Sequence, residues 1–311
     1  MTAIRLGTRA SALALAQSRL VADRLRAQVS DDVVLVEITS EGDRDHSPLA
    51  QIGGTGVFVS ALRDALVAGE IDMAVHSLKD LPTARTPDLR LAAIPEREDP
   101  RDVVVARDGL ALAELPRGSV VGTGSPRRAA QIRALGLGFR VDPIRGNVDT
   151  RIRLVQQRRV DAVVLARAGL SRLGRLREVT ETLDPLLMLP APGQGALAVE
   201  CREGDAALIA GLSALDHPST RSAVTAERSL LAALEAGCTA PVGALAEIAP
   251  GAAGEELWLR AVVAATDGSR IVRMSITGAP GEAWELGQKL AQDMLAEGVG
   301  ALTGEAGGNS A

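Results

Sequence analysis

The chain has 311 residues and a formal net charge of −5, and only 1% of its residues are aromatic, with no tyrosine. Proteins that bind nucleic acids usually carry a basic domain and stack bases on aromatic side chains, so this composition disfavours that class. The hydrophobic fraction of 46% and the charged fraction of 23% are ordinary for a globular protein, and the length suffices for two or three domains.

The two cysteines, Cys201 and Cys238, are too few and too far apart in sequence to indicate a disulfide framework or a metal site. The chain opens directly into a strand at Ile4, so we expect no signal peptide. No apolar run approaches the ~18 residues that a membrane-spanning helix needs. We therefore expect a cytoplasmic protein with no metal, no membrane partner and no nucleic-acid partner.

Apolar strands that alternate with helices predict an α/β fold for the first part of the chain. Strands are expected at 4–7, 33–38, 73–77 and 89–94, and helices at 12–28 and 57–68. Arg9 and Ser11 lie between a strand and a helix N-terminus, which favours an anion site, with Ser11 as a simple N-cap the alternative. Lys79 and Asp80 follow the buried strand at 73–77, where open α/β sheets bind ligands. A solvated turn is the alternative there, but the chain has only two lysines, which favours function.

A second α/β unit is predicted from strands at 103–106, 120–122, 139–144 and 162–166. Its first loop, Thr123-Gly124-Ser125-Pro126-Arg127-Arg128, combines small residues, hydroxyls and two arginines before a helix. A second loop runs from Arg145 to Arg151, and a further helix begins there. Together with the loop at Arg9, these arginine loops indicate a polyanionic ligand. Arg153, Arg158 and Arg159 are expected on a solvated helix face.

Two segments rich in charge, proline or glycine, 95–102 and 187–196, are typical of a double hinge between domains. The strand at 197–201 returns the chain to the first unit, and Cys201 within it is expected to be a buried structural thiol. After residue 217 the pattern changes to a small α+β domain. It has helices at 219–235 and 282–296 and strands at 242–248, 256–264 and 270–276. The predicted domains are therefore 1–97 with 196–216, 98–195, and 217–304, followed by a disordered tail at 305–311.

Cys238 lies in a loop of small residues, 234–243, between a helix and an apolar strand. Small neighbours leave a sulfur accessible, so we interpret Cys238 as the point where a group is carried covalently. The arginine loops upstream would bind that group.

Several ordered motifs give the chain a resemblance to a known family. They are Arg9-Ala10-Ser11, the runs 74–82, 96–102, 122–128, 145–151 and 190–196, Thr225-Ala226-Glu227-Arg228, Gly237-Cys238 and Pro241-Val242-Gly243. Together they resemble the porphobilinogen deaminases, also called hydroxymethylbilane synthases. The resemblance covers nearly the whole chain, and its many ordered motifs make it specific.

The resemblance implies a transferase of tetrapyrrole and haem biosynthesis that acts as a monomer. Four porphobilinogen molecules are joined head to tail with loss of ammonia, and water then releases hydroxymethylbilane. The primer is a dipyrromethane cofactor, which the resemblance places on Cys238 as a thioether. The implied fold is α/β with three domains: two domains like type II periplasmic binding proteins, joined by a double hinge, and a small C-terminal α+β domain.

The resemblance also implies roles for individual residues. Asp80 matches the catalytic aspartate, whose carboxylate would stabilise the cation formed when ammonia leaves. Each pyrrole ring carries an acetate and a propionate, which suit forked pairing with arginine. The implied cofactor- and substrate-binding residues are Arg9, Ser11, Ser77, Lys79, Thr123, Ser125, Arg127, Arg128, Arg145, Arg151, Arg172 and Gln194.

Three positions depart from the family pattern. Gln51 and Thr55 stand where lysines are common, in a long glycine-bearing segment, 39–55, that is expected to cover the bound chain. Gly124 replaces a common serine, and we expect the loss of one hydrogen bond there. None of these changes affects Asp80 or Cys238.

Two other classes of function are compatible with parts of the sequence. A non-catalytic small-anion binding or sensing protein would share the two-domain architecture, but it would have no need of a cysteine in a small-residue loop of a third domain. A thiol enzyme with Cys238 as nucleophile would need a histidine base, and the sequence does not single out His46, His76 or His217 for that role.

Overall fold

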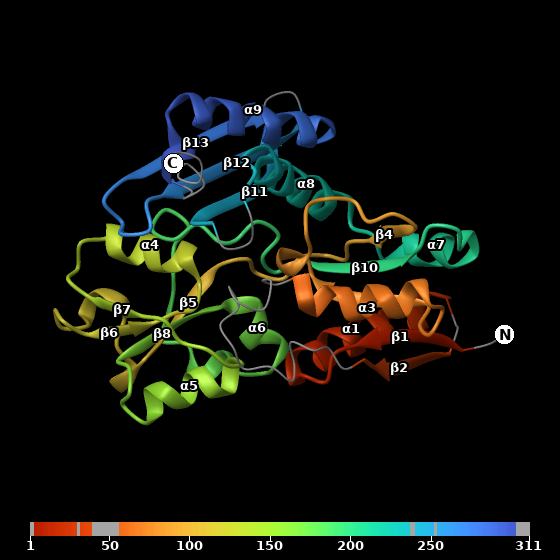
Figure 1. Cartoon of the computed structure of the whole chain (residues 1–311), viewed down its shortest axis with the longest axis horizontal. Coiled ribbons are helices and arrows are strands. Elements are labelled where there is room, and N and C mark those ends of the chain that lie inside the picture. The colour runs from red at the N-terminus through yellow and green to blue at the C-terminus, as the bar shows by residue number, and fades with distance from the viewer. Residues whose placement is uncertain (1–2, 30–31, 39–55, 237–239, 252–253, 303–311) are drawn as a thin grey trace, which may run out of the picture. The chain divides into compact units, whose positions relative to one another are not determined.

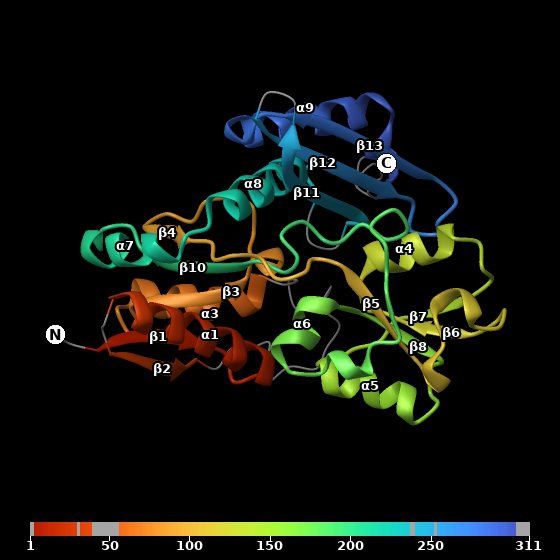
Figure 2. The same ribbon diagram turned by 180° about the vertical axis from the view of Figure 1, so that it is seen from behind.

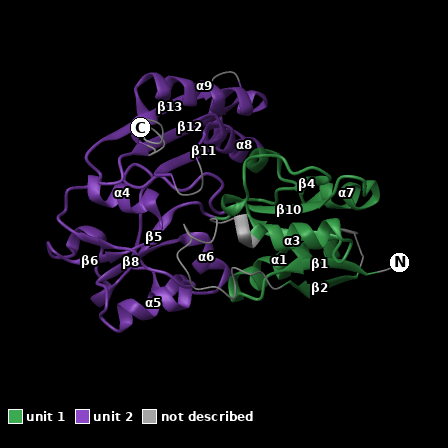
Figure 3. Cartoon of the chain, viewed as in Figure 1, with its two compact units in different colours: residues 1–98, 196–221 green, residues 99–195, 222–311 purple. Residues whose placement is uncertain are grey.

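The computed structural model describes residues 3–29, 32–38, 56–236, 240–251 and 254–302. The chain forms two compact units, Met1–Glu98 with Ala196–Arg221, and Asp99–Gly195 with Ser222–Ala311 (Figure 3). Three sheets are present in the described residues: two of five strands and one of three.

Unit 1 is built on a mixed sheet of order β2-β1-β3-β10-β4 (Figure 1). Strands β1, β2 and β3 are parallel, and β10 runs antiparallel to both β3 and β4. The elements are β1 (Ile4–Thr8), α1 (Ala12–Val29), β2 (Val33–Glu37), α3 (Gly56–Val67), β3 (Met73–Ser77), β4 (Leu89–Ala93), β10 (Leu197–Arg202) and α7 (Ala206–Leu212).

The strands of unit 1 are apolar on both faces because helices cover both. Met73 and Val75 of β3 pack in one core with Leu25 of α1, while Ala74 packs in a second core with Leu62 of α3. This alternation follows the two-residue period of a strand. It is the pattern of a sheet that is covered by helices on both faces.

Unit 2 contains a second mixed sheet, of order β7-β6-β8-β5-β9. Strands β6, β7 and β8 are parallel, and β5 is antiparallel to β8 and β9. The elements are β5 (Asp102–Ala106), β6 (Val120–Gly122), α4 (Pro126–Ala134), β7 (Arg140–Asp142), α5 (Val148–Gln156), β8 (Ala162–Ala166), α6 (Arg167–Arg172) and β9 (Glu181–Thr182). Ile132 of α4 packs on one face of this sheet, and Ile152 of α5 packs on the other (Figure 2).

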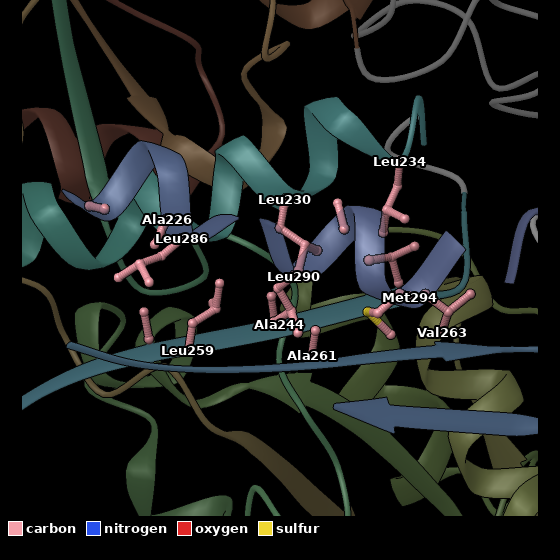
Figure 4. Packing of buried hydrophobic residues seen from close by; sticks show 14 of the residues in the cluster. Ala226, Leu230, Leu234, Ala244, Leu259, Ala261, Val263, Leu286, Leu290 and Met294 are labelled. Carbon is pink, nitrogen blue, oxygen red and sulfur yellow. The ribbon is translucent and has the colours of Figure 1, made fainter. Parts of the chain in front are cut away.

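The remainder of unit 2 is the predicted α+β domain. Its antiparallel sheet has the order β11-β12-β13, with strands β11 (Val242–Gly251), β12 (Gly254–Ala264) and β13 (Ile271–Gly278). Helices α8 (Pro218–Ala233) and α9 (Ala283–Ala296) pack on one face of it. Figure 4 shows Leu230 of α8 and Leu290 of α9 pointing toward Ala244, Leu259 and Ala261 of the sheet.

The two five-stranded sheets share one plan, and together with the C-terminal domain they confirm the predicted fold class. In each sheet, three parallel strands lie next to one antiparallel strand, β10 or β5. β10 begins directly after the predicted hinge segment 187–196, and β5 begins at the last residue of the segment 95–102. Because the strand is antiparallel, its first residue lies at the edge where the parallel strands end. Leu197 pairs with Ser77 in unit 1, and Asp102 pairs with Ala166 in unit 2.

Candidate functional site

In unit 1, the predicted loops of β1 and β3 lie at the same edge of the sheet. These strands are parallel neighbours, with Gly7 paired to Ala74, so the segments after Thr8 and Ser77 leave the sheet side by side. Arg9 and Ser11 are partly exposed there. The Ser11 hydroxyl accepts the Ala14 amide at 3.3 Å, so it caps α1, the alternative that the sequence left open.

Lys79 and Asp80 lie in a short 3₁₀ turn, Leu78–Asp80, directly after β3. Leu78 is fully buried, and its amide donates to the Ala196 carbonyl at 3.0 Å. The two charged residues that follow this anchor, Lys79 and Asp80, are partly exposed. On the sheet side, the Ser77 hydroxyl accepts from Gln17 of α1 at 2.9 Å. The buried Leu78 and the hydrogen-bonded Ser77 thus fix the end of β3, and Asp80 lies partly exposed at the sheet edge.

In unit 2, the arginine loops also share one edge of the sheet. Their strands, β7, β6 and β8, are parallel neighbours, so the segments that follow Asp142, Gly122 and Ala166 emerge together. Ser125 caps α4 through the Arg128 amide, and Asn147 caps α5 through the Thr150 amide. These caps place two helix N-termini at the edge, where backbone N–H groups favour anions.

Arg127 and Arg128 are buried around one carboxylate, that of Asp102. Asp102 is fully buried, and it accepts from Arg128 Nη2 at 2.8 Å and pairs with Arg127 Nη1 at 2.9 Å. Gln194 is fully buried as well, and its side-chain amide donates to the same carboxylate at 2.8 Å and to the Pro100 carbonyl at 2.7 Å. This network links α4 to both hinge segments.

The Asp102 network carries more positive than negative charge. Burial would raise the pKa of Asp102, but attraction to Arg127 and Arg128 outweighs burial and holds the pKa well below its usual value. Two guanidinium groups therefore face one ionised carboxylate, which leaves one positive charge unbalanced among the ion pairs of the described residues. Nearby, burial and repulsion from Arg128 lower the pKa of Arg151 to about 10. Such a pKa marks a cation that a bound anion would stabilise.

The other predicted arginines of this edge are Arg145 and Arg172. Arg145 is exposed, and Arg172 is partly buried and donates to the Gly195 carbonyl at 2.6 Å. Thr123 is buried, and its hydroxyl accepts the Ser125 amide at 3.2 Å. The structure thus brings the predicted residues of unit 2 to one sheet edge, some as exposed groups and some as buried supports.

The Asp102→Asn variant is expected to lose about 3–5 kcal/mol of stability, because two buried guanidinium groups lose their counter-charge. The matched control is Asp142→Asn, which removes one partner of the exposed Arg140–Asp142 pair and should cost less than about 1 kcal/mol. Urea unfolding at neutral pH measures both. Equal losses in the two variants would contradict this account of the network.

Gly124 has a steric reason to be glycine in this chain. A Cβ atom there would lie 2.6 Å from the Ile144 carbonyl oxygen, which is backbone and has little freedom to move. We expect Gly124→Ser to cost about 1–3 kcal/mol from this overlap. Gly281→Ser, in the same unit but with open space around its Cβ, should be nearly neutral. Thermal unfolding of both variants checks this; a neutral Gly124→Ser would show that the loop adapts freely.

Several predictions concern residues outside the described ranges: Cys238, His46, the segment 39–55 with Gln51 and Thr55, and the tail. Cys201 is described, and it is the buried thiol expected: it is fully buried, and burial raises its pKa to about 11. Of the other histidines, His76 is buried beside Glu200 and His217 bonds to Thr220. The described residues contain no cluster suited to a metal ion and no helix able to span a membrane.

Two carboxylates that are buried within strands were missed from the sequence, Asp102 and Glu200. Each stands in an otherwise apolar strand, Asp102-Val-Val-Val-Ala and Leu-Ala-Val-Glu200-Cys. That contrast is a usable signal, because a carboxylate is almost never fully buried unless it is paired.

The fold and the site define an α/β protein with two sheets, each collecting polar loops at one edge, and an appended α+β domain. A family model for the "porphobilinogen deaminase, dipyromethane cofactor binding domain" matches residues 4–210, and one for the C-terminal domain of the same family matches residues 222–296. The chain belongs to the porphobilinogen deaminase family. It is accordingly a transferase of tetrapyrrole biosynthesis, a hydroxymethylbilane synthase that uses a dipyrromethane cofactor.

Curated relatives agree with this assignment along nearly the full length. The chain is 61% identical to porphobilinogen deaminase 1 of Streptomyces coelicolor, with 97% of this chain and 98% of that protein covered. It is 59% identical to porphobilinogen deaminase of Mycobacterium tuberculosis, with 94% and 96% covered. These matches do not favour the alternative of a non-catalytic binding protein.

Among solved structures, the chain is similar to periplasmic binding proteins. A periplasmic substrate-binding protein of an ABC transporter from Coxiella burnetii is 15% identical at a TM-score of 0.44, covering 70% of this chain and 94% of that one. The methionine-binding protein MetQ is 13% identical at a TM-score of 0.43, covering 68% and 89%.

Proposed function

We propose that three groups of residues act when four porphobilinogen molecules are joined into hydroxymethylbilane: one binds the pyrrole carboxylates, one stabilises the reacting cation and one carries the cofactor. The arginine-bearing edge of unit 2 holds the acetate and propionate groups of the pyrrole chain. Asp80 in unit 1 stabilises the positive charge that develops at the reacting pyrrole, and Cys238 carries the cofactor. The observation that carries the proposal is the unbalanced positive charge around Arg127, Arg128 and Arg151.

The donor set of unit 2 fits a polycarboxylate. Arg145 and Arg151 offer forked N–H groups, which pair with carboxylates in two parallel hydrogen bonds. Further hydrogen-bond donors come from Thr123 and Ser125. The hinge segments are held by Arg172, which donates to Gly195, and by Gln194, which donates to Pro100. When bound, the dipyrromethane supplies the pyrrole carbon to which the first substrate molecule is joined. A net charge of −5 for the chain does not oppose this, because the local field of the arginine edge attracts anions.

Asp80 is proposed to act at the pyrrole nitrogen. Loss of ammonia from porphobilinogen leaves a cation whose charge is shared with the ring nitrogen, and an ionised carboxylate there lowers the energy of that state. The same carboxylate can accept a hydrogen bond from the pyrrole N–H and keep it while the new bond between pyrrole units forms. Arg9, Ser11, Ser77 and Lys79, at the same sheet edge, would orient substrate carboxylates beside it.

Intact-mass measurement during incubation with porphobilinogen tests the proposed function. The purified protein should gain mass in equal steps, each the size of one deaminated substrate, and then return to its starting mass as product is released. A protein that binds porphobilinogen without any covalent gain in mass would instead be the non-catalytic binding protein.

We further propose that the enzyme is a cytoplasmic monomer with domains at 1–97 plus 196–216, 98–195 and 217–304. The support is the family resemblance and a cysteine content that does not need an oxidising compartment. Light scattering on the purified chain tests the monomer, and a stable dimer at micromolar concentration would exclude it.

A further inference from the structure

A buried charged cluster in unit 1 has no part in the function proposed above. It consists of Arg63 of α3, His76 of β3 and Glu200 of β10, and we call it the Glu200 cluster. Arg63 donates to Glu200 through Nη2 at 2.8 Å and Nε at 3.0 Å, and His76 Nε2 lies 3.2 Å from the same carboxylate. The exposed fractions of the three side chains are 13%, 4% and 5%.

A contribution to the stability of the fold does not by itself explain why this cluster is buried. Its surroundings are apolar, with Leu62, Ala65 and Ala74 in the same layer. Burying an ion pair costs desolvation, and well-packed apolar residues of similar size commonly stabilise as much or more. Burial would raise the pKa of Glu200, but hydrogen bonds with His76 and Arg63 outweigh it and lower the pKa to about 2. The carboxylate therefore stays ionised at neutral pH, with Arg63 hydrogen-bonded to it and His76 Nε2 3.2 Å away.

The cluster joins three elements where the Asp80 turn begins. His76 immediately precedes Ser77, the last residue of β3, and Leu78 bonds to Ala196 at the start of β10. Ser77 is held on the α1 side by Gln17. His76 belongs to the opposite face, where Glu200 ties it to β10 and to α3. The end of β3 is thus held by Gln17 on one face of the sheet and by Glu200 on the other.

We propose that Glu200 is a positioning residue for the reaction: by holding His76 and Arg63 it fixes the end of β3 and the turn that carries Asp80. This inference rests on the proposed role of Asp80. Because Asp80 acts on charge that develops during the reaction, a displaced Asp80 weakens the chemical step. In the function proposed above, the arginine loops of the other unit bind most of the substrate carboxylates. Substrate binding should therefore change less than the chemical step, although Ser77 and Lys79 lie beside Asp80.

The test compares Glu200→Gln with a matched control at the opposite end of β3. The control is Asp72→Asn, just before the other end of β3, where Arg5 donates to Asp72 through Nε at 3.0 Å and Nη2 at 2.8 Å. The pKa of Asp72 is also lowered to about 2 by Arg5, so each variant removes an ionised carboxylate from a two-bonded arginine pair. Both holoenzymes are assayed for kcat, KM and cofactor mass at a temperature where both stay folded.

We expect Glu200→Gln to lower kcat about 10-fold or more, with a smaller change in KM and an unchanged cofactor mass, since misplacement by about 1 Å can cost ~100-fold. Asp72→Asn should lose stability and keep its kcat. Three results would overturn the proposal: an unchanged kcat in Glu200→Gln, an equal fall in both variants, or a rise in KM at constant kcat.

Two further variants keep the outcome decisive. If Glu200→Gln is recovered too poorly to assay, the double variant Arg63→Met/Glu200→Gln removes both charges and is judged by the same criterion, because removal of both partners is better tolerated than removal of one. Asp80→Asn is measured in parallel. A wild-type rate in Asp80→Asn refutes the proposed role of Asp80, whereas an inactive Asp80→Asn beside a fully active Glu200→Gln refutes only the positioning role.

Discussion

Replacement of Cys238 by serine is expected to abolish activity. A hydroxyl is a far weaker nucleophile than a thiolate, so the variant should fail to attach the primer on which the substrate chain is built. The intact mass of the wild-type protein should exceed that of the bare chain by roughly 420 Da, the size of two linked pyrrole units on one thioether, and the variant should lack this excess.

The other cysteine provides the matched control for that experiment. Cys201 is fully buried with a raised pKa of about 11, which keeps it protonated and unreactive. Cys201→Ala should therefore keep both the mass excess and activity, with some loss of stability from the cavity. If the excess disappears in Cys201→Ala and remains in Cys238→Ser, the attachment site is wrong.

Replacement of Asp80 by asparagine is expected to lower kcat by about 10²–10⁴-fold, the range of a lost charge-stabilising or acid–base group. The side chain keeps its shape but loses the charge that stabilises the developing cation, so KM should change little. Single-turnover mass measurement on cofactor-loaded protein follows the first addition directly and separates chemistry from product release.

Asp88→Asn is the control for the charge change itself. Asp88 is exposed eight positions further on, with a φ of 62° that asparagine adopts as readily as aspartate. It should behave as the wild type. If Asp80→Asn adds the first substrate at the wild-type rate, the carboxylate is not part of the reaction and another group must stabilise the cation.

Most of the fold was predictable because its signals are local. The strands at 4–8, 73–77 and 162–166 are short apolar runs, and the helix over Ala12–Val29 has a serine cap before it. The predicted strand at 139–144 is shorter in the structure, Arg140–Asp142, because only these residues pair with β6. The six-residue helix α6 and the two-residue strand β9 were not predicted, since neither is long enough to show a period.

In the candidate site, too, the features with a local sequence signal could be predicted, and those that depend on distant residues could not. The loop at 123–128, the Asp80 turn and Cys201 could be identified from residue types next to recognisable strands. The partners of Arg127 and Arg128 could not, since Asp102 and Gln194 are 26 and 66 positions from Arg128. No local pattern links such distant residues, and the sequence alone suggested that both arginines would face the ligand.

The sequence by itself determined which segments become strands and helices, where arginines and hydroxyls follow strands, and which family the chain resembles. These properties depend on neighbouring residues and on ordered motifs. Only the tertiary structure decided which loops share an edge, because strand order and direction set that. It also decided that Asp102 and Glu200 are buried and ionised, since a buried carboxylate needs partners that only the folded chain brings within hydrogen-bond distance.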